Sequence, residues 1–106
     1  ANLIPARLPG LLFVLLAPNR AQAWSCMLRD AHRHRSPNAG WPEAAMAGAL
    51  GVRLSGPRIY HGSIANEPWL NEGARDPAAA DVITGLRLYR YAMILLAGAF
   101  VALALA

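Results

Sequence analysis

The end of the chain places the strongest constraint on its fold, because the fifteen residues 92–106 include no polar side chain. Tyr89, Arg90 and Tyr91 precede this run, and aromatic and basic residues commonly mark the edge of a membrane-spanning helix. Fifteen helical residues cover only about 22 Å of a hydrocarbon core of roughly 30 Å. We therefore predict that the terminal transmembrane segment, residues 92–106, is extended by residues 82–91.

Composition supports the same class of protein. Hydrophobic residues make up 56% of the chain and charged residues only 15%, which is unusual for a soluble domain. A second apolar run, residues 8–17, is interrupted by Pro9 and Gly10, so it is interpreted either as the end of a span or as a re-entrant segment. The predicted fold is all-α: a multi-helix integral membrane protein fragment with an ordered cytoplasmic loop region.

The charges gather between the two apolar runs. All ten basic residues are arginines, and nine of them fall from Arg20 to Arg90. Basic residues of membrane proteins concentrate on the cytoplasmic side, so residues 20–91 are predicted to face the cytoplasm. The absence of lysine excludes a phosphate-binding loop of the GxxxxGK type and lysine nucleophiles. The single cysteine, Cys26, is expected to be a partly buried apolar side chain.

Within residues 20–91, two helices are predicted. An amphipathic helix is indicated by the apolar spacing of Trp24, Met27, Leu28 and Ala31. A second helix is expected to begin at Pro42, with Glu43 in its first turn, and to stop at Gly51. Its pairs of small residues four apart would let another helix backbone approach closely; these are Ala44 with Gly48 and Ala45 with Ala49.

Two further features of the segment are local. Residues 51–76 contain many glycines, prolines and polar residues and are interpreted as an ordered loop, with brief alternation at Val52 and Leu54. The terminal helix is expected to be capped by Asp81, or by Asp76 followed by Pro77.

The residues best suited to chemistry are concentrated in RDAHRHRSPNAGWPEAAMAGALGVRL, where acids, arginines and histidines adjoin a proline-bounded SPNAGWPE segment. Pro37 and Pro42 restrict the backbone, so Asn38 is predicted to be presented from a stiff turn. His32 and His34 would point about 200° apart on a helix, and no second ligand pair exists, so a bound transition metal is not expected.

This segment closely resembles the signature of the adenosylcobinamide-phosphate synthase family, also called CobD/CbiB. The opening ANLIPARL and the closing LRLYRYA fit the same family, so the resemblance covers essentially the whole chain as the C-terminal part of a longer enzyme. The sequence departs from the pattern at Ser55, where a second glycine is expected, and at His61, where a small or aromatic residue is usual.

The resemblance implies a multi-pass enzyme of the bacterial inner membrane that functions in cobalamin biosynthesis. Its substrates would be adenosylcobyric acid and aminopropanol or aminopropanol phosphate, joined as an amide with ATP and Mg²⁺. Other enzymes of the pathway would be possible partners. The isolated fragment is expected to be inactive.

The resemblance also implies site residues. Asp30 and Glu43 are the catalytic candidates, either as magnesium ligands or as acceptors of the amine proton. Arginines suit the binding of phosphate and carboxylate oxygens. The substrate-binding candidates are Arg29, Arg33, Arg35, Ser36, Asn38, Gly40, Trp41, Arg53 and Tyr60.

Structural explanations remain open beside these assignments. Asp30 could serve as the i,i+4 partner of His34, and Glu43 could stabilise the start of its helix. Trp24, Trp41 and Trp69 could stack on a flat ring, but tryptophans near membrane edges are more often interfacial anchors. The main alternative function is a non-catalytic membrane-anchored scaffold with a basic cytoplasmic segment. Nucleic-acid binding ranks last, because no recognition fold is indicated.

Overall fold

The computed structural model describes residues 3–34 and 36–106, and helices make up most of this part of the chain. The helices are α1 Leu3–Leu16, α2 Arg20–Asp30, the 3-10 helix η1 Ala31–Arg33, α3 Pro37–Leu50 and α4 Ala79–Leu105. Four short strands are also present: β1 Leu54–Ser55, β2 Arg58–Tyr60, β3 Ser63–Ala65 and β4 Trp69–Leu70. The predicted helical class is therefore confirmed, but the strict all-α assignment is wrong.

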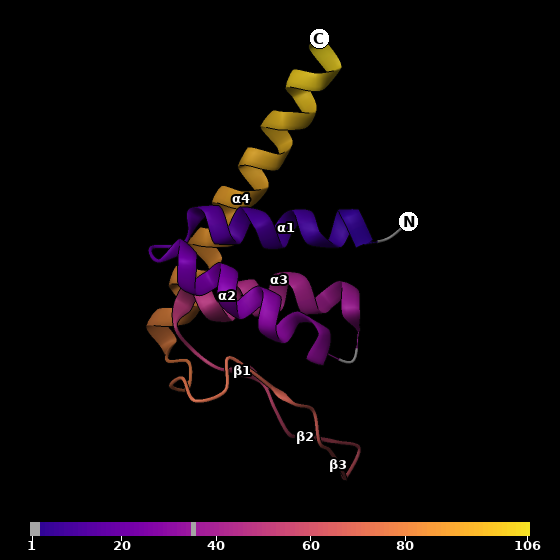
Figure 1. Cartoon of the computed structure of the whole chain (residues 1–106), viewed down its shortest axis with the longest axis vertical. Helices are drawn as coiled ribbons and strands as arrows, with labels where there is room; N and C mark the ends of the chain where they lie inside the picture. Colours follow the sequence, from indigo (N-terminus) through magenta and orange to yellow (C-terminus); the bar gives the residue numbers. More distant parts are fainter. Residues whose placement is uncertain (1–2, 35) are drawn as a thin grey trace.

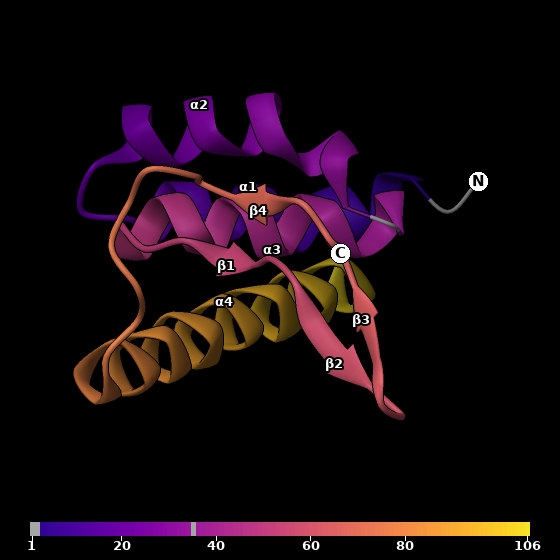
Figure 2. The same cartoon turned by 90° about the horizontal axis from the view of Figure 1, so that it is seen from below.

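Helix α3 is the centre of the arrangement, with α1 and α2 packed against it and α4 crossing the group (Figures 1 and 2). Small residues permit these close contacts. A side chain at Gly48 would meet the Cα of Ala23 at 2.8 Å, and one at Gly10 would meet the backbone of Trp41 at 3.1 Å. Ala44 and Ala45 are fully buried. The predicted close approach along the small-residue face of α3 is confirmed.

The buried face of α2 differs from the predicted one. Met27 and Ala31 are buried as expected, but Trp24 is 44% exposed and Leu28 is 50% exposed. Cys26 is buried, as expected for a small side chain. Helix α2 turns Ala23 and Cys26 toward Gly48 of α3, where small side chains allow the two backbones to approach closely. The apolar core joins α1, α2, α3 and α4 through these buried residues: Phe13, Val14, Ala17, Ala23, Met27, Ala45, Leu88 and Ala92.

Helix α3 starts five residues earlier than predicted. Ser36 is its N-cap, with an extended backbone, and Pro37 takes the first helical position, where no N–H is needed. The SPNAGWPE segment therefore forms the first turns of α3 and not a turn before it. The predicted end is confirmed, since Gly51 adopts a left-handed conformation with φ of 67°. Similarly, α1 continues through Pro9 without the predicted interruption.

Residues 51–76, predicted as a loop, contain two small antiparallel ladders. Strand β1 pairs with β4, placing Leu54 opposite Leu70. Strand β2 pairs with β3 to form a hairpin that extends away from the helices (Figure 1). The two-residue hairpin turn is formed by His61 and Gly62, whose φ angles of 50° and 79° are both positive, as a primed hairpin turn requires.

The two departures from the family pattern, Ser55 and His61, thus have left-handed backbone conformations. Ser55 has a φ of 65° and His61 a φ of 50°, in the region that favours glycine. A glycine at position 55, as the family resemblance led us to expect, would adopt this conformation without a steric penalty from a β-carbon.

Helix α4 is 27 residues long and is the one helix within the described residues that is long and apolar enough to cross a membrane. Its start is stabilised by Asp81, because a carboxylate oxygen accepts the N–H of the N-cap residue Ala78 at 2.7 Å. Asp81 was expected to precede the helix as its cap, as was Asp76 followed by Pro77, but the N-cap is Ala78 and Asp81 caps the helix from the third helical position. Arg75 pairs with the same carboxylate at 2.6 Å. The multi-pass arrangement stays a prediction.

Candidate functional site

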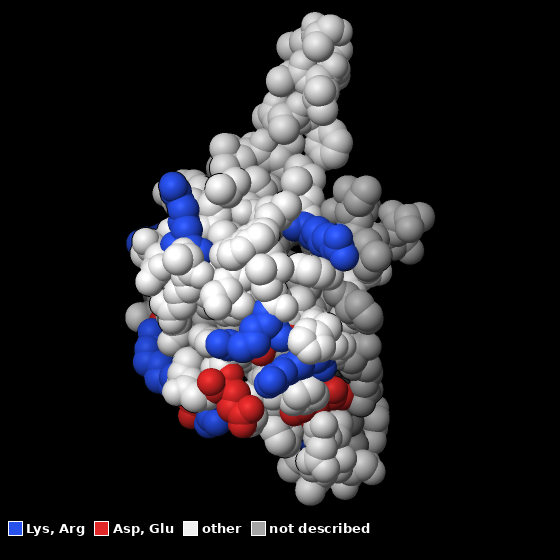
Figure 3. Space-filling model, in the orientation of Figure 1, with Lys and Arg blue, Asp and Glu red and all other residues white. Residues whose placement is uncertain are grey.

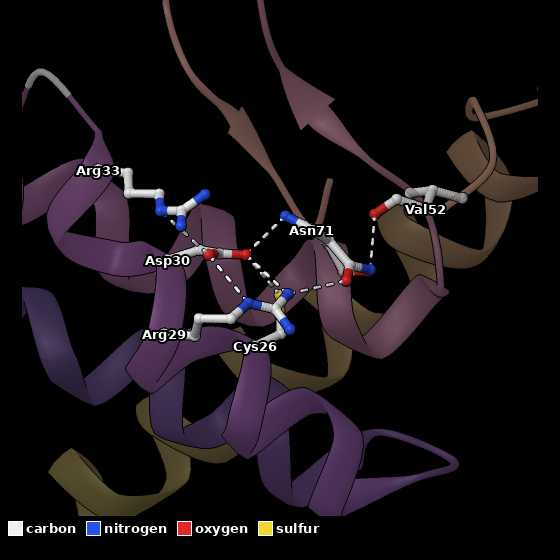
Figure 4. Close-up of polar contacts among 7 residues, drawn as sticks. Cys26, Arg29, Asp30, Arg33, Val52 and Asn71 are labelled. Atoms are coloured by element: carbon white, nitrogen blue, oxygen red, sulfur yellow. Dashed lines mark hydrogen bonds and ion pairs between the residues drawn. The ribbon is translucent and has the colours of Figure 1, made fainter. Parts of the chain in front are cut away.

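A buried polar network surrounds Asp30 at the end of α2 (Figure 4). The side chain of Asp30 is 1% exposed, and its oxygens accept hydrogen bonds from Arg29 Nε at 3.0 Å and Arg29 Nη2 at 2.8 Å. Arg33 lies 3.6 Å away, and the thiol of Cys26 donates to the carboxylate at 3.7 Å. The carboxylate therefore has partners on both oxygens.

Asn71 connects this network to the strands. Its backbone N–H donates to Asp30 Oδ2 at 2.8 Å, and its side-chain oxygen accepts from Arg29 Nη2 at 3.2 Å. Its amide nitrogen donates to the carbonyl oxygens of Ala47, in the last turn of α3, and of Val52. Asn71 has a φ of 59°, which asparagine tolerates better than most residues. One side chain thus joins α2, the end of α3 and β4.

The network sets the ionisation of its members. Burial alone would raise the pKa of Asp30, but hydrogen bonds from Arg29 and from the Asn71 N–H outweigh it, so the net pKa lies below its usual range. Burial, reinforced by the charge of Asp30, raises the pKa of the Cys26 thiol to about 11. Asp30 is therefore ionised and Cys26 protonated at neutral pH.

A second cluster lies at the other end of η1, around His34. Nε2 of His34 is 2.8 Å from Oε2 of Glu43, and the backbone N–H of Ser36 donates to His34 Nδ1 at 2.9 Å. Because Nδ1 accepts a hydrogen bond, the proton of the neutral ring is on Nε2, which donates to Glu43. The pair is partly accessible, with His34 18% and Glu43 30% exposed.

Glu43 also borders an apolar groove of about 480 Å³ between α1, α3 and α4. The groove is lined by Pro9, Phe13, Pro42, Glu43, Met46, Leu54, Tyr89 and Met93. Among these residues Glu43 alone carries a formal charge. A carboxylate at the edge of an apolar hollow favours a ligand with a cationic group and an apolar body.

Arg53 is engaged with its neighbours on the strand side. Its Nε pairs with Asp76 at 2.6 Å, and its guanidinium carbon lies 3.9 Å from the ring centre of Trp69. Gly56 packs against the same ring, since a side chain there would meet it at 2.6 Å. Trp69 is thus covered by its own chain, which favours a structural role over stacking on a ligand.

The structure divides the predicted site residues into two groups. Arg29, Asp30 and Arg33 belong to the network of Figure 4, whereas Ser36, Gly40 and Glu43 surround His34. The others lie apart. Asn38 is exposed in the first turn of α3, the ring of Trp41 lies 4.6 Å beneath the guanidinium carbon of Arg7, and Arg53 lies at the strands. Arg35 and the side chain of Tyr60 lie outside the described residues.

Three residues of these clusters, Cys26, His34 and Asn71, were not identified from the sequence as site residues. His34 was considered only as a partner of Asp30 or as a weak metal ligand, and its actual partner is Glu43. Asn71 had one usable signal, because it stands before Glu-Gly in a loop, where asparagine is favoured for a left-handed backbone. Its contact with Asp30, across 41 positions of sequence, had no local signal.

The fold and the two clusters define a helical protein with one candidate membrane span and a partly accessible polar site beside it. The CobD/Cbib protein family model matches residues 1–89. The cobalamin biosynthesis protein CobD of Rhodobacter capsulatus is 70% identical over 87% of this chain, and that of Brucella suis is 50% identical over 99%. The CobD of Klebsiella pneumoniae is 45% identical over 83% of the chain.

This chain therefore belongs to the CobD/CbiB family. It spans about a third of the length of these relatives, with 29% of the Rhodobacter capsulatus protein and 34% of the Brucella suis protein covered. No solved structure is significantly similar to it.

Proposed function

We propose that the chain functions in cobalamin biosynthesis and contributes to a site that forms an amide between adenosylcobyric acid and aminopropanol or its phosphate. The observation that carries this proposal is the position of Glu43, which borders the apolar groove and is held by His34. The names of the relatives support the pathway, and the resemblance of the SPNAGWPE segment supports the reaction.

Amide formation requires an activated carboxylate and a neutral amine. In the proposed reaction ATP activates the carboxylate of the corrinoid, and the amine nitrogen attacks the acyl carbon. A C–N bond forms, the activating phosphate group leaves, and the nitrogen releases a proton. Two protons leave the nitrogen in all, because a free amino alcohol arrives as an ammonium ion: the Glu43 carboxylate attracts this ion and accepts its first proton before the attack, and the departing phosphate accepts the proton released as the C–N bond forms.

The other site residues fall into supporting roles. Arg33 is 42% exposed beside the network, so its guanidinium can reach phosphate or carboxylate oxygens of a substrate. Asn38 is exposed in the first turn of α3 and is assigned to the polar edge of the corrinoid. Asp30 and Arg29 hold α2 and β4 in position for these residues.

The proposed reaction would bring a magnesium ion to the site together with ATP. Among residues 3–34 and 36–106 no three His, Cys, Asp or Glu side chains are grouped as a metal site. Magnesium bound with ATP needs only one or two carboxylates besides phosphate oxygens. Asp30 does not fit this requirement, since its oxygens are buried and engaged, whereas Glu43 is accessible.

We further propose that α4 crosses the bacterial inner membrane and that the segment of residues 20–91 lies on its cytoplasmic side. The part of α4 that protrudes beyond the other helices has no charged side chain, and the arginines and acids lie below it (Figure 3). Helix α1 runs across α4 rather than alongside it (Figure 1). Leu8, Leu11 and Leu15 are on its exposed face, so α1 is placed along the bilayer surface.

The test is complementation of a bacterium that lacks its own copy of this gene and grows only if it converts adenosylcobyric acid to cobinamide. The full product of the gene that encodes this chain should restore growth, and Glu43→Gln should not. Glu72→Gln, which removes an exposed carboxylate away from the groove, should restore growth normally. Failure of the unmodified, membrane-inserted protein would contradict the proposal and favour a scaffold.

A further inference from the structure

Three residues of the SPNAGWPE segment converge on one side chain, His34, that lies outside this segment. Ser36 donates its backbone N–H to Nδ1, and Glu43 accepts from Nε2. Gly40 faces the β-carbon of His34, and a side chain at Gly40 would approach that carbon to 2.9 Å. The start of α3 therefore contacts His34 at both ring nitrogens and at its β-carbon.

The close approach at Gly40 has a second component. A β-carbon at this position would also overlap the carbonyl oxygen of Ala31, in η1. Because Gly40 lacks a side chain, η1 and the chain that leads to His34 can lie directly on α3. This packing fixes the backbone next to His34, and hydrogen bonds at both ring nitrogens fix the ring itself.

The hydrogen bonds define what the ring can do. With Nδ1 occupied by the Ser36 N–H, the neutral ring has one donor, Nε2–H, and it is directed at Glu43. This donor restricts the rotation of the Glu43 carboxylate, which otherwise has free torsions on the surface of α3. The ring is more buried than the carboxylate, so Glu43 is the member of the pair that is presented to the groove.

We propose that His34 is a positioning residue for Glu43, which it holds so that the carboxylate faces the amine substrate in the groove. This inference rests on the proposed amide-forming function. His34 acts through Glu43 and does not itself touch the substrate. The arrangement accounts for the glycine at position 40, where a β-carbon would meet that of His34, and for the glutamate at position 43, which accepts from the ring. Ser36 contributes its backbone N–H.

The experiment compares three variants of the full gene product in membranes, with amide formation measured as kcat and KM for the amine. His34→Leu keeps the bulk but removes the donor, His34→Gln restores an N–H donor, and His32→Leu removes the neighbouring exposed histidine as the matched control. Correct placement of a general base contributes about 10²–10⁴-fold to a rate. We expect His34→Leu to lower kcat by about 10–100-fold, with KM changed less than about threefold.

We also expect His34→Gln to recover most of the rate and His32→Leu to match the unmodified protein. Equal kcat for His34→Leu and the unmodified protein would overturn the positioning role. If the Leu variant does not fold, His34→Gln decides: a kcat within about tenfold of the unmodified value supports the role, and a loss of about a hundredfold overturns it. Absence of amide formation by the unmodified protein would instead refute the proposed function itself.

Discussion

Replacement of Asp30 by alanine should destabilise the fold, mainly because it removes one buried hydrogen bond. The carboxylate accepts the N–H of Asn71 at 2.8 Å, and Asn71 is 8% exposed, so removal of the carboxylate leaves a buried donor without a partner. Such a group costs about 1–3 kcal/mol. Arg29 is 51% exposed and can be hydrated in the variant, so the loss of its ion pair adds only about 1 kcal/mol.

The expected total for Asp30→Ala is therefore about 2–4 kcal/mol of lost unfolding free energy. The assay is denaturant unfolding of the full gene product in detergent micelles. Arg33→Ala is the matched control, because Arg33 is 3.6 Å from the same carboxylate and 42% exposed, and its removal should cost less than about 1 kcal/mol. A change below about 0.5 kcal/mol for Asp30→Ala would refute the reasoning.

Four further predictions follow from the fold. Since the pKa of Asp30 is lowered by folding, its contribution to stability should be complete above about pH 4 and decline as the pH falls further, as measured by unfolding at stepped pH. Gly48→Ala should destabilise by about 1–3 kcal/mol, since its β-carbon would lie 2.7 Å from that of Cys26; unchanged thermal stability would contradict this packing. Ser55→Gly should stabilise by about 0.5 kcal/mol because φ is 65°, as checked by the same unfolding assay. Leu95→Arg should impair insertion of α4 by about 2.5–3.5 kcal/mol in a translocon insertion assay, and normal insertion would contradict a span.

Much of the helical framework was predictable because it depends on local patterns. The helical run over 92–105 and the stop at Gly51 each follow from a few neighbouring residues, and the structure has both. Asp81 does stabilise the start of α4, although from inside its first turn. The start of α3 was misplaced because Pro37 and Pro42 are both compatible with a first turn. The choice between them depends on tertiary contacts, above all on the fit of Gly40 against η1.

The two polar clusters were only partly predictable. The cluster members on the SPNAGWPE segment were predicted from the family resemblance, but the residues that contact them lie elsewhere in the chain. Asn71 reaches Asp30 because β4 pairs with β1, and so short a pairing has no recognisable sequence period. His34 meets Glu43 because η1 interrupts the helical path after Asp30, which changes the direction of every side chain that follows.

The exposed residues of α2 show a further limit of pattern-based reasoning. Trp24 and Leu28 had the spacing of a buried face, yet the chain buries smaller residues there. Helical periodicity identifies a face that is apolar, but which face contacts α3 depends on the size of the side chains, since α2 and α3 touch at a glycine.

The central claim is that Glu43 supports amide formation from an amine and an ATP-activated corrinoid carboxylate. The most direct measurement is mass-spectrometric detection of the amide product in membranes that contain the full gene product, adenosylcobyric acid, aminopropanol phosphate and ATP. The account predicts ATP-dependent product with the unmodified protein and with Glu72→Gln, and at least about a hundredfold less with Glu43→Gln. Undiminished product with Glu43→Gln, at equal amounts of inserted protein, would contradict it.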